Sequence, residues 1–199
     1  MRIIGGTFRG RRLHSPGGRP GRTAGSRMIR PTLDRYREAV FNIIGLETEG
    51  ATVLDLFAGT GALGLEAMSR GAVLSVFVDR YRQSLELIGK NIEACGCADR
   101  TIVIKRDLTR GLHFLAGYSP PGGFSLIFSD PPYGKGLSAG IVQEIEKRNL
   151  LGHGGLLVAE DAEEESLPEK IGTIYLASRR EYGDSAFWLF RRPPGDERL

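Results

Sequence analysis

The run Asp130-Pro131-Pro132-Tyr133 is the segment whose residue types most clearly suit a chemical reaction. The two prolines remove two backbone N–H donors and stiffen the chain, while the Asp130 carboxylate and the proline carbonyls remain as hydrogen-bond acceptors. A rigid set of acceptors beside an aromatic ring suits a planar base with an exocyclic amine. The amine would donate to the acceptors and Tyr133 would stack on the ring. The alternative is an ordinary turn stiffened by prolines.

A second candidate site is the Gly-x-Gly-x-x-Gly pattern at residues 59–64, which follows the apolar run 52–56 and opens a helical stretch. Glycines let the backbone turn tightly and approach a ligand closely. In this context the pattern indicates a nucleotide-type cofactor, the alternative being a tight turn without a ligand. Asp79, twenty residues after the first glycine, suits the ribose hydroxyls of such a cofactor, and Asp107 suits an adenine amino group. The candidate cofactor-binding residues are Asp55, Phe57, Gly59, Gly61, Asp79, Arg80, Asp107 and Leu108.

Alternating apolar and helical stretches from residue 51 onward predict the elements that position these residues. This alternation is typical of the α/β class, with a mostly parallel sheet covered by helices on both faces. The chemistry is then expected beyond the carboxyl ends of the strands. The last two apolar runs have no helix between them, which indicates an antiparallel hairpin at one edge of the sheet. The expected strands are 52–56, 74–78, 101–104, 124–128, 155–159, 173–178 and 186–190, and the expected helices are 34–44, a stretch ending at Arg70, 81–94 and 138–147.

Positive charge is concentrated at the N-terminus. Residues 1–30 contain eight of the 27 basic residues, all of them Arg, and none of the 24 acidic residues. A basic arm favours a polyanionic partner, and arginine suits forked contacts with phosphates; a solvated tail is the alternative. Residues 2–13 predict a short hairpin, and residues 15–27, rich in Gly, Pro, Ser and Arg, predict a loop. The candidate RNA-binding residues are Arg2, Arg9, Arg11, Arg12, Arg30 and Thr32, and the predicted parts of the chain are an extension over 1–30, a main domain over 31–192 and a frayed tail over 193–199.

Composition excludes several classes of protein. The chain is 41% hydrophobic and 26% charged, as expected of a globular domain rather than a disordered chain. The sequence has no run of 18 apolar residues and no apolar N-terminal segment, so we expect a cytoplasmic protein without a membrane span. Two cysteines, Cys95 and Cys97, and three scattered histidines predict no metal site. We expect a monomer by default, and the acidic run 160–165 predicts a solvated loop.

Together these motifs resemble a known group of enzymes. The segment 55–64 with Asp79, Asp107 and the run 130–133 is similar to the class I S-adenosylmethionine-dependent methyltransferases that modify exocyclic amines. Further segments narrow the resemblance to the bacterial 16S ribosomal RNA guanine-N2 methyltransferase family, over almost the whole chain. These segments are Arg2-Ile3-Ile4-Gly5-Gly6, Arg9-Gly10-Arg11, Arg30-Pro31-Thr32, Asp34-Arg35, Val40-Phe41-Asn42 and Tyr182-Gly183-Asp184.

The resemblance implies a seven-stranded, Rossmann-like methyltransferase sheet, mostly parallel with an antiparallel edge strand and extended by an N-terminal basic hairpin. It implies S-adenosylmethionine as the cofactor. The acceptor would be a guanine of 16S rRNA, met as free RNA or in a partly assembled 30S particle. On this interpretation the catalytic residues are Asp130, Pro131, Pro132 and Tyr133. Asp130 and the Pro131 carbonyl accept hydrogen bonds from the guanine amine, and Tyr133 fixes the ring plane.

The resemblance also implies roles for the cofactor-binding residues. Gly59 and Gly61 pass close to the methionine portion, Asp55 holds its ammonium group and Asp79 holds the ribose. Asp79 stands where a Glu is common in the family, a change that keeps the carboxylate.

Three other functions remain open. DNA adenine-N6 methyltransferases share the run 130–133, but they usually carry a sizeable target-recognition region for which this chain has no room. A nicotinamide-dependent oxidoreductase would use the same glycine pattern but leaves Asp130 to Tyr133 unexplained. A non-catalytic RNA-binding assembly factor on a methyltransferase body would bind the cofactor without turnover, and the intact run 130–133 argues against it.

Overall fold

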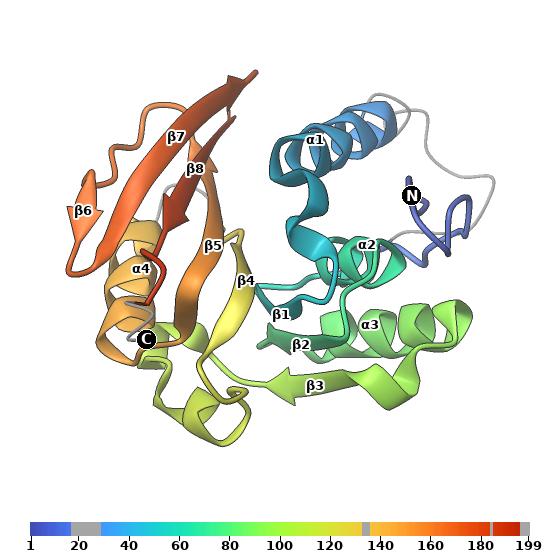
Figure 1. The fold of residues 1–199 in the computed structure, drawn as a ribbon. Helices are drawn as coiled ribbons and strands as arrows, with labels where there is room; N and C mark the ends of the chain where they lie inside the picture. The colour runs from blue at the N-terminus through green and yellow to red at the C-terminus, as the bar shows by residue number, and fades with distance from the viewer. Residues whose placement is uncertain (17–28, 133–135, 184, 196–199) are drawn as a thin grey trace.

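Eight strands form one mixed sheet in the computed structural model, which describes residues 1–16, 29–132, 136–183 and 185–195 (Figure 1). Strands β1 to β5 pair with one another in parallel, and β8, β7 and β6 extend the sheet beyond β5 in antiparallel pairs. In spatial order the strands are β3 (Thr101–Lys105), β2 (Leu74–Asp79), β1 (Thr52–Leu56), β4 (Phe124–Ser129), β5 (Leu151–Ala162), β8 (Ser185–Arg191), β7 (Ile174–Tyr182) and β6 (Lys170–Ile171).

The central strands send alternate side chains into two separate cores, one on each face of the sheet. In β1, Val53 lies in one core and Leu54 in the other. In β8, Leu189 lies in the core of Val53 and Trp188 in the core of Leu54. All residues of β1 after Thr52 are buried. Burial on both faces explains why such strands read as continuous apolar runs in the sequence.

Helices cover both faces of the sheet. Helices α1 (Ile29–Ile44), α2 (Ala62–Ser69) and α3 (Arg82–Cys95) contribute to one core, and α4 (Leu137–Lys147) contributes to the other. Helix α1 begins before the predicted stretch 34–44, and Pro31 is tolerated because it lies in the first turn. Short 3₁₀ turns complete the fold: η1 (Gly45–Thr48), η2 (Ala98–Arg100), η3 (Leu108–Arg110) and η4 (His113–Gly117).

The α/β class and the mostly parallel sheet are confirmed, but the predicted number of seven strands is wrong. The eighth strand, β6, has two residues and is too short to leave an apolar pattern. Strand β8 lies between β5 and β7 rather than at the edge, in keeping with the burial of its first six residues. Strand β5 extends beyond the predicted 155–159 and includes the first residues of the acidic run. The prediction of a solvated loop over 160–165 is therefore wrong for residues 160–162, which belong to β5.

The predicted N-terminal hairpin is present as one antiparallel bridge between Arg2 and Arg12. Backbone hydrogen bonds join Ile3 N–H to Arg11 O and Leu13 N–H to Met1 O. The side chains of Ile3 and Leu13 are buried in the same core as α1 and α2. The hairpin is therefore packed on the body of the protein. Most of the predicted loop 15–27 and the end of the predicted tail 193–199 lie outside the described residues.

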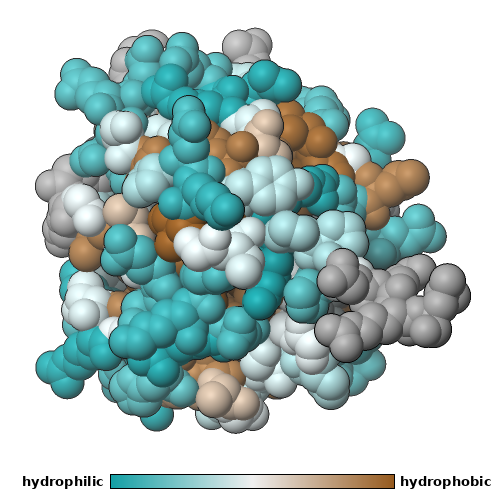
Figure 2. Space-filling model, turned by 60° about the vertical axis from the view of Figure 1, so that its left-hand side comes forward, coloured by the Kyte–Doolittle hydropathy of each residue, from teal (hydrophilic) through white to brown (hydrophobic). Residues whose placement is uncertain are grey.

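Figure 2 shows one face of the molecule on which hydrophobic side chains appear in small separate groups among hydrophilic ones. Large exposed apolar residues are scattered along the chain, such as Leu46 near the start of η1 and Val73 before β2. No helix among the described residues is long and apolar enough to cross a membrane.

Candidate functional site

The strand order reverses between β1 and β4, and a cavity of about 250 Å³ lies at this reversal. The loops that follow β1 and β4 lead away from each other, so a crevice opens beyond the carboxyl ends of the strands. The segments after β1, β2, β3 and β4 all contribute to the lining. The lining residues are Phe57, Asp79, Arg80, Tyr81, Arg106, Asp107, Leu108, Thr109, Asp130, Pro131, Pro132 and Leu137.

The glycine loop connects β1 to α2. Its glycines occupy positions where any other residue would be strained or would clash. Gly59 and Gly61 have φ angles of 56° and 75°, in the left-handed region. A Cβ atom on Gly64 would lie 2.3 Å from the Phe77 ring, so a glycine is needed for α2 to pack on β2. Phe57, which lines the cavity, also has a positive φ of 59°. Such a conformation in a non-glycine residue is uncommon and is found at ligand-binding sites.

The Asp55 carboxylate lies beneath this loop. It is buried, and its Oδ2 accepts a hydrogen bond from the Gly64 N–H in the first turn of α2 at 2.9 Å. Burial raises the pKa of Asp55 to about 7; the Gly64 hydrogen bond opposes this rise, and the negative charge of Asp79 adds to it. Asp55 holds the turn into α2 and does not line the cavity. Its contact with a cofactor stays a prediction.

Asp79 joins two of the loops that border the cavity. Its Oδ2 accepts a hydrogen bond from the Gly59 N–H at 2.9 Å, and its Oδ1 accepts one from the Tyr81 N–H at 2.8 Å. Each carboxylate oxygen has a second lone pair, so the group retains capacity for a ligand hydroxyl. Asp79 thus fixes the glycine loop to the end of β2 while facing the cavity.

Asp107 is held in place by the turn that follows β3. Its Oδ1 accepts hydrogen bonds from the Thr109 hydroxyl at 2.7 Å and from the Thr109 N–H at 3.1 Å. These hydrogen bonds lower the pKa of Asp107, and the bond from the Thr109 hydroxyl has the largest effect. Its Oδ2 lies 3.9 Å from the Arg80 guanidinium. Asp107 lines the cavity, and with only this long contact its Oδ2 retains lone pairs for a ligand.

Four carboxyl groups converge around the end of β4. Asp130 is accessible from the cavity but sits among densely packed protein atoms, and this desolvation is the largest cause of its raised pKa. The negative charges of Glu160, Asp55 and Asp161 raise the pKa further. Asp161 is buried and accepts a hydrogen bond from the Ser138 hydroxyl. This set of acids favours a cationic ligand, because a positive charge would relieve the mutual repulsion.

The two prolines extend the acceptor side of the cavity. Pro131 is buried, Pro132 is exposed, and both line the cavity next to Asp130. Tyr133, predicted to stack on the acceptor ring, lies outside the described residues.

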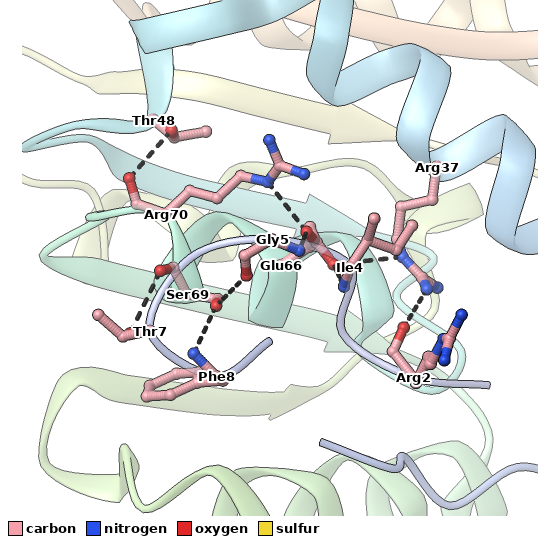
Figure 3. Close-up of polar contacts among 10 residues, drawn as sticks. All are labelled: Arg2, Ile4, Gly5, Thr7, Phe8, Arg37, Thr48, Glu66, Ser69 and Arg70. Atoms are coloured by element: carbon pink, nitrogen blue, oxygen red, sulfur yellow. Dashed lines mark hydrogen bonds and ion pairs between the residues drawn. The ribbon is translucent and has the colours of Figure 1, made fainter. Parts of the chain in front are cut away.

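The N-terminal hairpin is fixed to α2 by the buried Glu66 carboxylate (Figure 3). Glu66 accepts hydrogen bonds from the Ile4 and Gly5 N–H groups, each at 2.8 Å. Arg70 Nε donates to the same carboxylate at 2.9 Å, and Arg37 Nε from α1 lies 3.5 Å from it. One carboxylate thus connects the hairpin, α1 and α2.

The turn of the hairpin is tied to the last residue of α2. The N–H of Thr7 donates to the Ser69 carbonyl at 2.7 Å. The N–H of Phe8 donates to the Ser69 hydroxyl at 2.8 Å (Figure 3). Helix α2 starts at the glycine loop and leads away from the cavity, so this turn lies at the far end of the helix. Arg11 donates to the Ala94 carbonyl near the end of α3, a contact that engages its guanidinium within the protein.

The predicted RNA-binding arginines therefore have different environments. Arg2, Arg9, Arg11 and Arg12 are all exposed, and Arg11 in addition donates to the Ala94 carbonyl of α3. Arg30 and Thr32 belong to the first turns of α1, and their side chains lie outside the described part of the structure. None of the hairpin's described residues lines the cavity.

The cavity brings together most of the predicted site residues. Of the cofactor-binding candidates, Phe57, Asp79, Arg80, Asp107 and Leu108 line it, while Gly59, Gly61 and Asp55 shape the loop behind it. The residues that we did not predict are Tyr81, Arg106, Thr109 and Leu137 in the lining, and Glu160 and Asp161 near Asp130. Tyr81 and Arg106 adjoin predicted residues, so extending the search by one residue would have found them. Within the described ranges, no three His, Cys, Asp or Glu side chains are grouped so as to hold a metal ion.

Comparisons with known proteins agree on one family. The model of the family described as conserved hypothetical protein 95 matches residues 1–191. "Ribosomal RNA small subunit methyltransferase D" of Escherichia coli K12 is 33% identical over 96% of this chain and 90% of its own length. "Putative rRNA methyltransferase YlbH" of Bacillus subtilis is 33% identical over 96% of this chain and 99% of its own. The solved structure "Putative methyltransferase yhhF from Escherichia coli" has a TM-score of 0.79 at 32% identity and covers 97% of this chain and 98% of that one. The predicted Rossmann-like methyltransferase fold is thereby confirmed.

Proposed function

The chain belongs to the conserved hypothetical protein 95 family, and from this membership we propose that it methylates the N2 amine of a guanine in small-subunit ribosomal RNA, with S-adenosylmethionine as methyl donor. The observation that carries the proposal is the position of Asp130 and Pro131 in the same cavity as Asp79 and Asp107. An amine-facing set of acceptors and a nucleotide-facing set of carboxylates thus border one space. The names of the relatives support methyl transfer to ribosomal RNA.

The residues around the cavity fit S-adenosylmethionine. The left-handed glycine loop leaves backbone close to the space, since a Cβ on Gly59 would meet no packed side chain within 4 Å. Asp79 has free lone pairs for ribose hydroxyls, and the second oxygen of Asp107 is placed for a base amine. S-adenosylmethionine also carries a positive sulfonium and an ammonium group, which the carboxyl groups around Asp130 would stabilise.

The chain's own residues act by holding and orienting the acceptor. The bound cofactor supplies an electrophilic methyl group, so the reaction needs an oriented amine rather than a metal or a covalent nucleophile. The Asp130 carboxylate and the Pro131 carbonyl accept the two amine hydrogens and direct the nitrogen lone pair at the methyl group. As the N–CH₃ bond forms and the C–S bond breaks, with its electron pair left on sulfur, the nitrogen gains positive charge that the same acceptors stabilise. The methylated amine then loses one proton, which the Asp130 carboxylate can accept and pass to water. Asp130 must be ionised to act in this way, so its raised pKa links activity to pH.

The test offers tritiated methyl S-adenosylmethionine and one of three substrates: protein-free 16S rRNA, purified 30S particles and duplex DNA. The RNA substrates come from a strain that lacks the methyltransferase. We expect N2-methylguanosine in RNA, identified by mass spectrometry of the nucleosides, and far slower formation of it with the Asp130→Ala variant. N6-methyladenine in DNA would overturn the choice of substrate. Cofactor binding without transfer to any substrate would favour a non-catalytic assembly factor instead.

A further inference from the structure

We propose that the basic surface beside the cofactor cavity, formed by Arg80, Tyr81, Lys105, Arg106, Arg110, His113 and Phe114, binds the phosphates and an unpaired base of the RNA substrate. The proposal rests on the proposed function, because it takes RNA to be the substrate. It assigns RNA binding to the turns after β2 and β3, in addition to the N-terminal hairpin.

The surface is a depression of about 730 Å³ that continues from the cavity. The two spaces share Arg80, Tyr81, Arg106 and Asp107, so a strand lying in the depression would reach the cavity rim. A single carboxylate, Asp107, lines the depression beside four Lys and Arg side chains. Such an excess of positive charge is complementary to a phosphodiester backbone.

Aromatic rings stand among these cations, as in many sites for single-stranded nucleic acid. The Tyr81 side chain is 55% exposed, which is unusual for a large aromatic residue. The Arg80 guanidinium lies 4.5 Å from the centroid of the Tyr81 ring, and the Arg106 guanidinium lies 5.7 Å from that of Phe114. The stacked arginines present charge and flat surface together, and both features suit an unpaired nucleotide.

The position of the N-terminal hairpin strengthens this assignment. Its turn is tied to Ser69 at the far end of α2, about 12 Å along an eight-residue helix from the glycine loop. Its Arg11 is engaged by the Ala94 carbonyl. The hairpin can hold a distant part of the RNA, whereas the basic surface adjoins the cavity itself through Arg80, Arg106 and Asp107, on the side assigned to the cofactor.

The test uses the double variant Lys105→Glu/Arg110→Glu, because both residues line the depression and neither lines the cofactor cavity. The control is Lys170→Glu/Arg180→Glu, which makes the same change in charge on β6 and β7. These strands lie at the opposite end of the sheet from β3. Binding of protein-free 16S rRNA is measured over a range of salt concentrations, S-adenosylhomocysteine affinity by calorimetry, and methyl transfer under single-turnover conditions.

We expect the Lys105/Arg110 variant to bind RNA at least tenfold more weakly, with unchanged S-adenosylhomocysteine affinity. The slope of log affinity against log salt should fall by about 0.7 to 0.9 for each lost phosphate contact. An equal loss in the control variant, or no loss in either, would overturn the proposal. A parallel loss of S-adenosylhomocysteine affinity would overturn it too, since the surface would then serve the cofactor. If the wild-type protein binds RNA through this surface but transfers no methyl group, the surface stands and the proposed function fails.

Discussion

Asn91 donates a hydrogen bond from its side-chain amide to the carbonyl oxygen of Thr60, joining α3 to the glycine loop at 2.9 Å. The same amide nitrogen donates to the His14 carbonyl at 3.1 Å, and the Asn91 side-chain oxygen accepts from the His14 N–H at 2.6 Å. Asn91 is fully buried, and these three bonds use both of its donor hydrogens and its acceptor. The glycine loop and the end of the N-terminal hairpin segment are therefore positioned by one side chain.

Replacing Asn91 with Leu should weaken cofactor binding although Asn91 does not line the cavity. The change keeps the volume and removes the partner of the Thr60 carbonyl and of the His14 backbone. Thr60 is half-buried and His14 is exposed, so each lost hydrogen bond should cost about 0.5 to 1.5 kcal/mol. We expect a lower melting temperature and a several-fold weaker affinity for S-adenosylhomocysteine, measured by calorimetry well below the melting temperature. The exposed neighbour Lys90→Ala serves as the control on the same helix. A folded Asn91→Leu protein with wild-type affinity would show that the bond to Thr60 has no positioning role.

Replacing Glu66 with Gln should destabilise the whole protein. The neutral amide would turn an NH₂ group toward the N–H groups of Ile4 or Gly5 and would leave Arg37 and Arg70 near an uncharged partner. Breaking a buried ion pair by removing one partner costs about 3 to 5 kcal/mol, so urea denaturation should show a large loss of unfolding free energy. Glu86→Gln, in an exposed pair with Arg82, should change it by less than about 1 kcal/mol. Similar losses in both variants would contradict the buried network.

The sequence predicts the parallel part of the fold well because those strands obey one simple rule. Strand β1 spans the predicted residues 52–56, since a strand buried on both faces appears as an apolar run between a loop and a glycine turn. The glycine loop, Asp79 and Asp130 follow such strands directly, so the strand ends place them at one edge.

The features that the sequence did not reveal depend on contacts between distant segments. Glu160 belongs to an acidic run that is typical of a solvated loop, yet β5 extends through it because β8 pairs with it there. Glu66 lies in a short helix, and its burial follows from the hairpin that covers it sixty residues away in the chain. Contact with a distant segment determines the surroundings of both residues. A single sequence does not show which distant segments pair or in which register.

Replacing Asp130 and Asp79 should separate catalysis from cofactor binding. The Asp130→Ala variant removes an acceptor that stabilises charge in the transition state, so its single-turnover rate should fall about 10²- to 10³-fold. Its affinity for S-adenosylhomocysteine should stay nearly unchanged. Asp79→Ala should do the reverse and weaken S-adenosylhomocysteine binding, because it removes the carboxylate that fixes the glycine loop. Equal losses of rate and affinity in the Asp130 variant would refute this division of roles.

Replacing Glu160 with Gln should move the pH dependence of methyl transfer toward acid. The pKa of Asp130 is raised first by desolvation among the surrounding protein atoms and then by the negative charge of Glu160, so the carboxylate form becomes dominant only at higher pH. Activity should therefore rise with pH through this raised pKa. Removing the Glu160 charge lowers the pKa of Asp130, and the rising limb should shift to lower pH in single-turnover profiles. Glu163→Gln, in the turn after β5, is the control that should leave the limb in place. If the limb does not shift in the Glu160 variant, the charge of Glu160 does not influence the titration of Asp130.

The buried Asp55 should make the protein less stable as pH rises toward neutrality. Its pKa is about 7 in the folded protein against 3.8 as the ordinary value, so the folded state holds a proton that the unfolded chain releases. The stability that this proton contributes is fully present below pH 3.8. It is lost progressively as the pH rises to about 7. Urea denaturation between pH 5 and 8 on Asp55→Asn should show a weaker decline than the wild type, since the amide cannot ionise while its oxygen can still accept from Gly64. If both proteins decline equally, the pH dependence comes from other carboxyl groups, such as the coupled acids around Asp130.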